Sequence, residues 1–100
     1  MSAVAGLPAT FRFRLYIVGG AQNSAQALAN LSQLCRRYLV DRHDIEVIDV
    51  FLEPQRALVD RIFMTPTLIR VTPEPAVRIV GTLSKSDTVL RALGLDDLPS

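Results

Sequence analysis

The chain has 100 residues, the length of one domain, and 49% of them are hydrophobic, which is enough to build a core. With 11 basic and 10 acidic residues the net charge is +1, so there is no electrostatic case for a nucleic-acid-binding protein. The single cysteine, Cys35, excludes an intrachain disulfide.

Residues 1–10 are small and rich in alanine, and we interpret them as a flexible lead-in. They lack the charged and apolar segments of a secretory signal, and no apolar run in the sequence is long enough to span a membrane. We therefore expect a cytoplasmic protein. We expect one folded domain at 11–94, followed by a short tail at 95–100.

Two stretches of the first half read as strands. Residues 11–18 alternate phenylalanine, leucine and isoleucine with other side chains, and a period of two predicts a strand with one buried face. Gly19 and Gly20 end it. Residues 45–50 are mostly apolar and β-branched, which predicts a strand covered on both faces.

A helix is predicted between these strands. Residues 24–39 place apolar side chains at helical spacing, as in an amphipathic helix. Asn23 or Ser24 would cap its first turn. The apolar stripe consists of Leu28, Leu31, Cys35 and Tyr38.

The second half continues with a helix, a proline and a strand. Pro54 suits the first position of a helix, because its missing N–H is no loss there, and residues 54–63 are predicted helical. Thr65-Pro66 then opens a strand at 66–71, since helices end before a proline. This X-Pro bond is a candidate cis peptide; the alternative is a trans proline that only opens the strand.

A fourth strand and a last helix complete the chain. Proline-rich residues 72–75 predict a turn before a strand at 76–80. Ser84 and Asp87 resemble a capping box, with Asp87 in place of the usual glutamate. Gly94 stands where a C′ glycine would end the helix.

The predicted order is therefore β-α-β-α-β-β-α. The connection from 18 to 45 is long enough for a parallel crossover, and the connection from 71 to 76 fits a hairpin. The compact solution is α/β, a four-stranded mixed sheet with helices on both faces. This is the thioredoxin-like arrangement.

The chemistry of thioredoxin-like enzymes is missing. A redox site needs Cys-x-x-Cys at the first helix, and residues 19–24 contain no cysteine. Cys35 on the apolar stripe reads as a buried hydrophobe, and His43 as a loop residue without a second metal ligand. A glutathione-transferase-like site would need a polar pair that residues 81–84 offer poorly. We expect no catalytic residue, cofactor or metal.

Several short segments carry a pattern through their order and spacing. They are Leu15-Tyr16-Ile17-Val18-Gly19, Asn23-Ser24, Val47-Ile48-Asp49-Val50, Pro54-Gln55, Thr65-Pro66-Thr67-Leu68, Pro73-Glu74-Pro75 and Arg78-Ile79-Val80-Gly81-Thr82-Leu83-Ser84. Together they resemble the KaiB family of circadian clock proteins, over about residues 11–90. A related pattern occurs in the KaiB-like sensor domain of clock histidine kinases.

The resemblance implies a protein that is not an enzyme and binds a KaiC-like ring ATPase, with KaiA or a clock histidine kinase as further partners. It also implies two folds: a thioredoxin-like monomer that binds KaiC, and a resting tetramer in which the half beyond about residue 50 rearranges. The alternative function is a thioredoxin-like adaptor in stress or redox signalling, again without catalysis.

The resemblance also suggests residues for these roles. Arg14, Arg70 and Arg78 match basic residues of the family and are our candidates for a partner-binding surface; the alternative for each is an ordinary solvated strand residue. Gln26 and Glu46 depart from the family, which carries a basic residue and a lysine there, so the partner could be a divergent KaiC or another protein.

The choice between the two folds is predicted to depend on the last helix. Ala92 stands where the family has glycine, and Gly94 where it has aspartate, and both changes favour a helix. The Ser84–Asp87 box would add to this preference, whereas the β-branched Thr88 and Val89 would suit a strand. We expect the thioredoxin-like monomer to be favoured over the tetramer.

Overall fold

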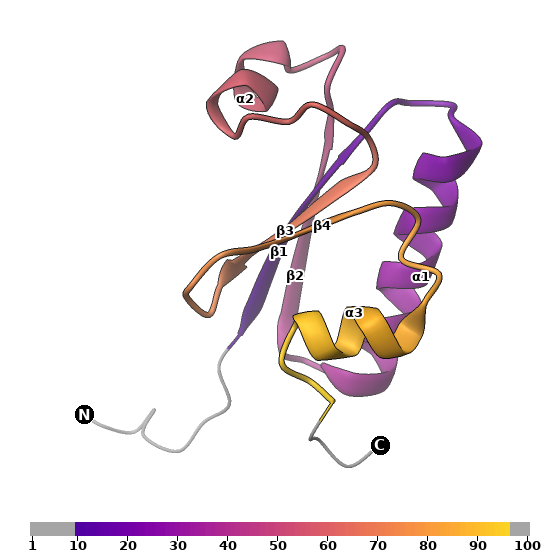
Figure 1. The fold of residues 1–100 in the computed structure, drawn as a ribbon, viewed down its shortest axis with the longest axis vertical. Coiled ribbons are helices and arrows are strands. Elements are labelled where there is room, and N and C mark those ends of the chain that lie inside the picture. Colours follow the sequence, from indigo (N-terminus) through magenta and orange to yellow (C-terminus); the bar gives the residue numbers. More distant parts are fainter. Residues whose placement is uncertain (1–9, 97–100) are drawn as a thin grey trace.

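The computed structural model describes residues 10–96. Of the expected lead-in only residue 10 is described, and of the expected tail only residues 95–96. Four strands form one mixed sheet in the order β2-β1-β3-β4, with α1 and α3 on one face and α2 on the other (Figure 1). The predicted element order and the thioredoxin-like fold are confirmed. The elements are β1 (Phe11–Ile17), α1 (Gln22–Tyr38), β2 (His43–Asp49), α2 (Pro54–Val59), β3 (Thr67–Thr72), β4 (Val77–Val80) and α3 (Ser86–Ala92).

Strand β1 lies inside the sheet and fixes its geometry. It runs parallel to β2 and antiparallel to β3, and β3 pairs with β4 as an antiparallel hairpin. Because side chains alternate along a strand, Phe13 and Leu15 face α1 and α3, whereas Arg14 and Tyr16 face α2.

The larger core lies between the sheet and the pair α1 and α3. Phe13 and Leu15 of the sheet meet Leu31 and Cys35 of α1 there. Leu95 is also buried in this core, one residue into the stretch interpreted as a tail. The smaller core, under α2, contains Tyr16, Ile48, Ala57 and Ile69.

Two predictions about the α2 side were wrong. Helix α2 has six residues instead of extending to 63, because the chain turns at Asp60 and Arg61 takes a φ of 55°. Strand β2 is an edge strand in which only Ile48 is buried, so it is not covered on both faces. As a result, much of the sheet face on the α2 side is exposed to solvent.

The predicted helix caps were also partly wrong. The N-cap of α1 is Ala21, and Ser24 lies inside the helix, where its Oγ accepts a hydrogen bond from the Val18 N–H (3.1 Å). The N-cap of α3 is Lys85, and Ser84 makes no capping bond. Its Oγ instead accepts a hydrogen bond from the Thr82 hydroxyl (3.2 Å).

The end of α3 follows the prediction. Gly94 lies at C′ with a φ of 74°, which a residue with a side chain rarely adopts. The Gly94 N–H donates to Arg91 O and the Leu95 N–H to Leu90 O, the paired bonds of a Schellman motif.

Within the part of the chain that the structure describes, three X-Pro peptide bonds are cis: Thr65–Pro66, Thr72–Pro73 and Glu74–Pro75. The first precedes β3, and the other two lie in the turn between β3 and β4. Within residues 10–96, every helix is too short or too polar to cross a membrane.

Candidate interaction surface

Six large apolar side chains are exposed around α2. They come from the segment after β2, from the end of α2 and from the segment before β3, which lie at the same end of the molecule (Figure 1). Phe63 is 88% exposed and Met64 63%. We call this set the α2-end surface: Phe51, Leu52, Leu58, Val59, Phe63 and Met64.

Beside this surface the 61–64 segment and β4 enclose an open groove of about 530 Å³. Its apolar walls consist of Phe63, Met64 and Val80. The lining also includes two arginines, Arg61 and Arg78. The lining residues are Arg61, Ile62, Phe63, Met64, Thr67, Arg78 and Val80.

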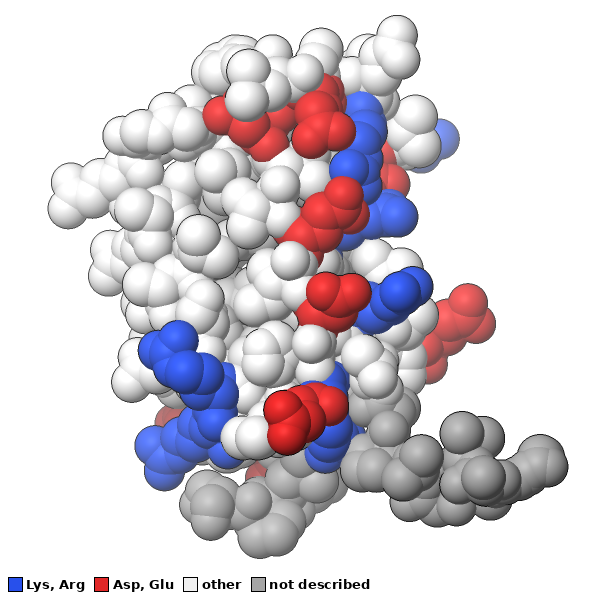
Figure 2. Space-filling model, turned by 180° about the vertical axis from the view of Figure 1, so that it is seen from behind, with Lys and Arg blue, Asp and Glu red and all other residues white. Residues whose placement is uncertain are grey.

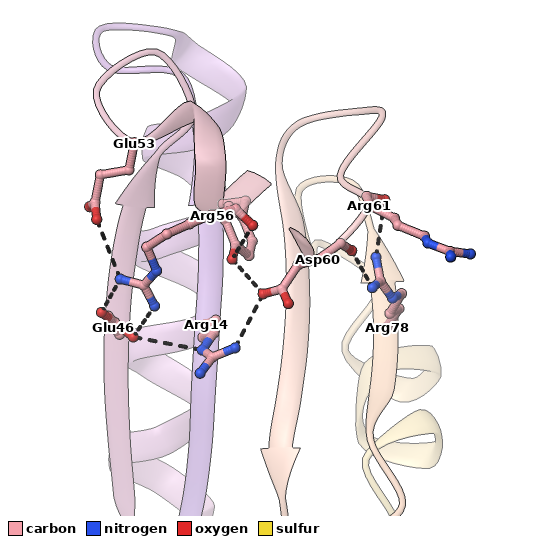
Figure 3. A network of polar contacts seen from close by, with 8 residues as sticks. Arg14, Glu46, Glu53, Arg56, Asp60, Arg61 and Arg78 are labelled. Atoms are coloured by element: carbon pink, nitrogen blue, oxygen red, sulfur yellow. Dashed lines mark hydrogen bonds and ion pairs between the residues drawn. The ribbon is translucent and has the colours of Figure 1, made fainter. Parts of the chain in front are cut away.

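A network of charges crosses the sheet face below α2 (Figure 3). Glu46 on β2 accepts a hydrogen bond from Arg56 Nη2 (2.9 Å) and lies 3.8 Å from Arg14 Nε. Arg14 Nη1 in turn donates to Asp60 Oδ2 (3.2 Å). Nearer the other end of β1, Arg12 pairs with Asp44. Figure 2 shows charged side chains of both signs following one another along the long axis of this side.

Asp60 anchors the end of α2 to the sheet. Its carboxylate accepts hydrogen bonds from the buried Tyr16 hydroxyl and from Arg14, and its backbone carbonyl accepts one from Arg78. Arg78 also donates to Arg61 O (3.3 Å). The 60–64 segment is therefore held from β1 and β4.

These contacts shift the pKa of Tyr16 and the pKa of Glu46. Burial, together with the hydrogen bond and the negative charge of Asp60, raises the pKa of Tyr16 to about 12. The hydrogen bond from Arg56 lowers the pKa of Glu46, which keeps that carboxylate ionised. Tyr16 is therefore a neutral hydrogen-bond donor near neutral pH.

The structure does not bring the three candidate arginines together. Arg14 and Arg78 lie on the α2 side of the sheet, whereas Arg70 lies opposite Phe13 on the other side. Arg70 is only 8% exposed, and it donates to Leu93 O and Pro75 O (both 2.8 Å). The prediction that all three share one surface was wrong, because strand alternation separates them.

In this chain the loop at 19–24, where a thioredoxin carries its redox cysteines, is fixed by a hydrogen bond to Asp49. The Gly19 N–H donates to Asp49 Oδ2 (2.9 Å), and a Cβ at Gly19 would lie 2.6 Å from that oxygen, so a side chain there would displace the Asp49 carboxylate. Cys35 is fully buried, and burial raises its pKa to about 11. Within residues 10–96, acidic residues, histidine and cysteine form no group that could hold a metal.

The remaining sequence candidates lie as follows. Gln26 is exposed on α1, and Glu46 belongs to the charge network. The α2-end surface was not predicted from the sequence, because the helix beginning at Pro54 was expected to continue to residue 63. The sequence did contain one sign of this surface, the adjacent apolar pair Phe63-Met64 just before Thr65-Pro66. Because β3 begins at Thr67, that pair lies outside the sheet.

The family model and the sequence relatives agree on one family. The KaiB domain model matches residues 14–95. Circadian clock protein KaiB3 of Synechocystis sp. is 46% identical over 86 residues, covering 86% of this chain and 82% of that protein. Circadian clock oscillator protein KaiB of Thermosynechococcus vestitus is 40% identical over 93 residues, covering 93% and 84%.

Two solved structures show the same fold at low identity. The N-terminal domain of Synechococcus elongatus SasA superposes with a TM-score of 0.71 at 17% identity, covering 95% of this chain and 93% of that one. Chloroplastic thioredoxin z superposes with a TM-score of 0.70 at 20% identity, covering 94% and 84%. The family model and the relatives together show that this chain belongs to the KaiB family, the circadian clock proteins.

Proposed function

We propose that the protein is a non-catalytic interaction module of the cytoplasm that binds a KaiC-type ring ATPase in clock or clock-like regulation, in its thioredoxin-like state. KaiA or a clock histidine kinase is a further candidate partner. Family membership supports the class of partner. The single observation that supports a binding role for this fold is the α2-end surface, where six large apolar side chains face solvent.

The proposed contact is the α2-end surface, flanked by Arg14 and Arg78. Apolar side chains that become buried supply most of the binding energy of an interface, while charged groups at its rim set specificity and association rate. Arg70 is excluded from this contact because it is buried on the other side of the sheet.

The test uses the KaiC-like ATPase of the same cell and a matched pair of variants. Leu58→Ser with Val59→Ser removes two apolar contacts of the α2-end surface and should weaken binding by about tenfold or more. Val40→Ser is the control, because Val40 is 60% exposed but lies between α1 and β2. Biolayer interferometry would measure both, at low and high salt.

Two results would contradict the proposal. One is the absence of binding between the wild-type protein and the ATPase. The other is equal binding of the α2 variant and the Val40→Ser control, which would place the contact elsewhere.

The departure at Glu46 requires its own variant. A lysine at 46, as the family resemblance implies, would lie between Arg14 and Arg56 and be repelled by both. We therefore propose Glu46→Lys together with Arg56→Glu, which keeps an ion pair of reversed polarity. The double variant should bind an ordinary cyanobacterial KaiC more tightly than Glu46→Lys alone does; equal affinities would show that this pair does not affect recognition.

A further inference from the structure

The groove between the 61–64 segment and β4 is not explained by the stability of the fold. Phe63 and Met64 project from a segment that contributes little to either core, and Val80 of β4 is 54% exposed beside them. An apolar lining that remains in solvent is available to a side chain of another molecule.

The walls of this groove are held in place before any partner arrives. Arg78 binds the carbonyls of Asp60 and Arg61, Asp60 is tied to β1, and the Thr67 hydroxyl donates to Met64 O (2.6 Å). A preorganised segment loses little conformational freedom on binding, so more of the contact energy appears as affinity.

The charge of the groove differs from that of the neighbouring sheet face. There the cations Arg12, Arg14 and Arg56 each lie against a carboxylate. In the groove, Arg78 donates to neutral carbonyls, and the Arg61 side chain extends away from the network (Figure 3). Neither Asp nor Glu is among the described residues that line it.

The nearest carboxylate does not neutralise these two cations. The Asp60 side chain is turned toward Arg14 and Tyr16 and is only 18% exposed. Among residues 10–96, the groove therefore combines apolar walls with two arginines that pair with no carboxylate.

The position of the groove favours an extended occupant. In the described sheet β4 is an edge strand, so one side of its backbone is available to pair with an added segment. An extended chain along β4 would direct alternate side chains toward the groove side and toward the opposite side of the sheet.

From these observations we propose that the groove binds an extended acidic–apolar segment of a partner protein. One apolar side chain lies between Phe63, Met64 and Val80, and neighbouring carboxylates pair with Arg61 and Arg78. The inference rests on the proposed function for the identity of the partner, and adds the chemistry of the partner segment.

Two capped hexapeptides test this chemistry without the ATPase: Gly-Glu-Leu-Leu-Glu-Gly and the same peptide with lysine in place of glutamate. In a ¹⁵N NMR titration of the full chain at millimolar peptide, the acidic peptide should shift the amides of Phe63, Met64, Thr67 and Val80. The lysine peptide should bind roughly fivefold more weakly at low salt, and this difference should shrink in about 0.5 M salt.

Two variants of equal charge separate the groove from the charge of the whole protein. Arg61→Glu should abolish the preference for the acidic peptide. Arg91→Glu, on exposed α3, changes the net charge equally and should leave the preference intact. Groove amides that do not shift, equal responses to the two peptides, or equal effects of the two variants would overturn the proposal.

The ATPase gives an independent readout. Arg61→Glu should weaken its binding by roughly fivefold or more, with the slower association expected of a lost electrostatic contact. Complete absence of ATPase binding to the wild-type protein would contradict the proposed function alone, because the peptide titration does not depend on it. ATPase binding that is unchanged by Arg61→Glu would overturn the groove as the contact for that partner.

Discussion

Arg70 is a buried cation whose partners among the described residues are neutral groups. Its guanidinium joins Leu93 O, at the end of α3, to Pro75 O in the turn before β4, and lies 5.9 Å from the Phe11 ring centre. The negative end of the α3 dipole adds to this attraction. Arg70 therefore ties the last helix to the hairpin.

Arg70→Met should destabilise the fold. It keeps the aliphatic volume but leaves two carbonyls without their donors, which is expected to lower the free energy of unfolding by about 1–3 kcal/mol. Urea unfolding would measure the loss, and hydrogen exchange should show it first in α3. The control is Arg12→Met, since Arg12 is exposed and its contact with Asp44 is 4.0 Å long. Equal stability of the two variants would contradict this role.

Tyr16 makes stability depend on alkaline pH. Because folding raises its pKa from 10.0 to about 12, the stabilisation is fully present below pH 10 and is lost as the pH rises through 12. Between about pH 8 and 12, the Tm should therefore fall more steeply with pH for the wild type than for Tyr16→Phe, whose phenyl ring cannot ionise. Parallel curves for the two proteins would show that Tyr16 does not titrate with unfolding.

The burial of Arg70 could not be predicted from the residues around it. Residues 67–72 read Thr-Leu-Ile-Arg-Val-Thr, and a nearly continuous apolar run does not show which face is buried. Phe11 to Ile17 do alternate, and the burial of Phe11, Phe13 and Leu15 was predicted; the burial of Tyr16 on the opposite face, under α2, was not. The exposure of Phe63 depended on where α2 ends, and the positive φ of Arg61 that ends it has no signal in the sequence.

At the scale of elements, the residues we propose as determinants of the fold state lie in α3 and beside its two ends. Ala92 ends the helix and Gly94 closes it with a Schellman motif. Ser84 makes no capping bond, so the proposed capping contribution is removed, although Asp87 still lies favourably in the first turn.

Ala92→Gly should weaken α3 by roughly 0.8–1 kcal/mol, the difference between the helix propensities of the two residues. Backbone chemical shifts of Ser86 to Leu93 should become less helical, and hydrogen exchange there should be faster. Ala25→Gly, at an exposed position of α1, is a control for a general glycine effect. If the α3 shifts respond equally to both variants, Ala92 has no special role.

The loop between β1 and α1 should have no thiol chemistry. Residues 19–24 contain no cysteine, and the raised pKa of buried Cys35 keeps its thiol protonated at neutral pH. We expect no turnover in an insulin-reduction assay and slow alkylation by iodoacetamide until the protein is unfolded. Turnover that persists in Cys35→Ser would contradict the non-redox interpretation.

At the scale of the whole molecule, the order and type of the elements were predictable because each strand or helix has its own period and boundary residues. The edge position of β2 was not, since an apolar β-branched sequence usually indicates cover on both faces. That cover is absent at most of β2 because α2 is short and reaches only the Ile48 end of the strand.

We predict that the chain in solution is a monomer in the thioredoxin-like fold. The buried contacts of Leu93 and Leu95 with the larger core depend on the helical form of the last segment. Light scattering coupled to size exclusion would give the mass, and backbone shifts of residues 86–92 the secondary structure. A tetramer with strand shifts in that segment would contradict the prediction.

The two open edges of the sheet have a consequence for colloidal behaviour. Unpaired strand edges are templates for aggregation, and proteins protect them with charges, prolines or short strands. Here β2 carries Asp44 and Glu46, while β4 is only four residues long, contains Arg78 and follows Pro75. We therefore expect the ionised Glu46 carboxylate to oppose edge-to-edge pairing of sheets in concentrated solutions of this chain.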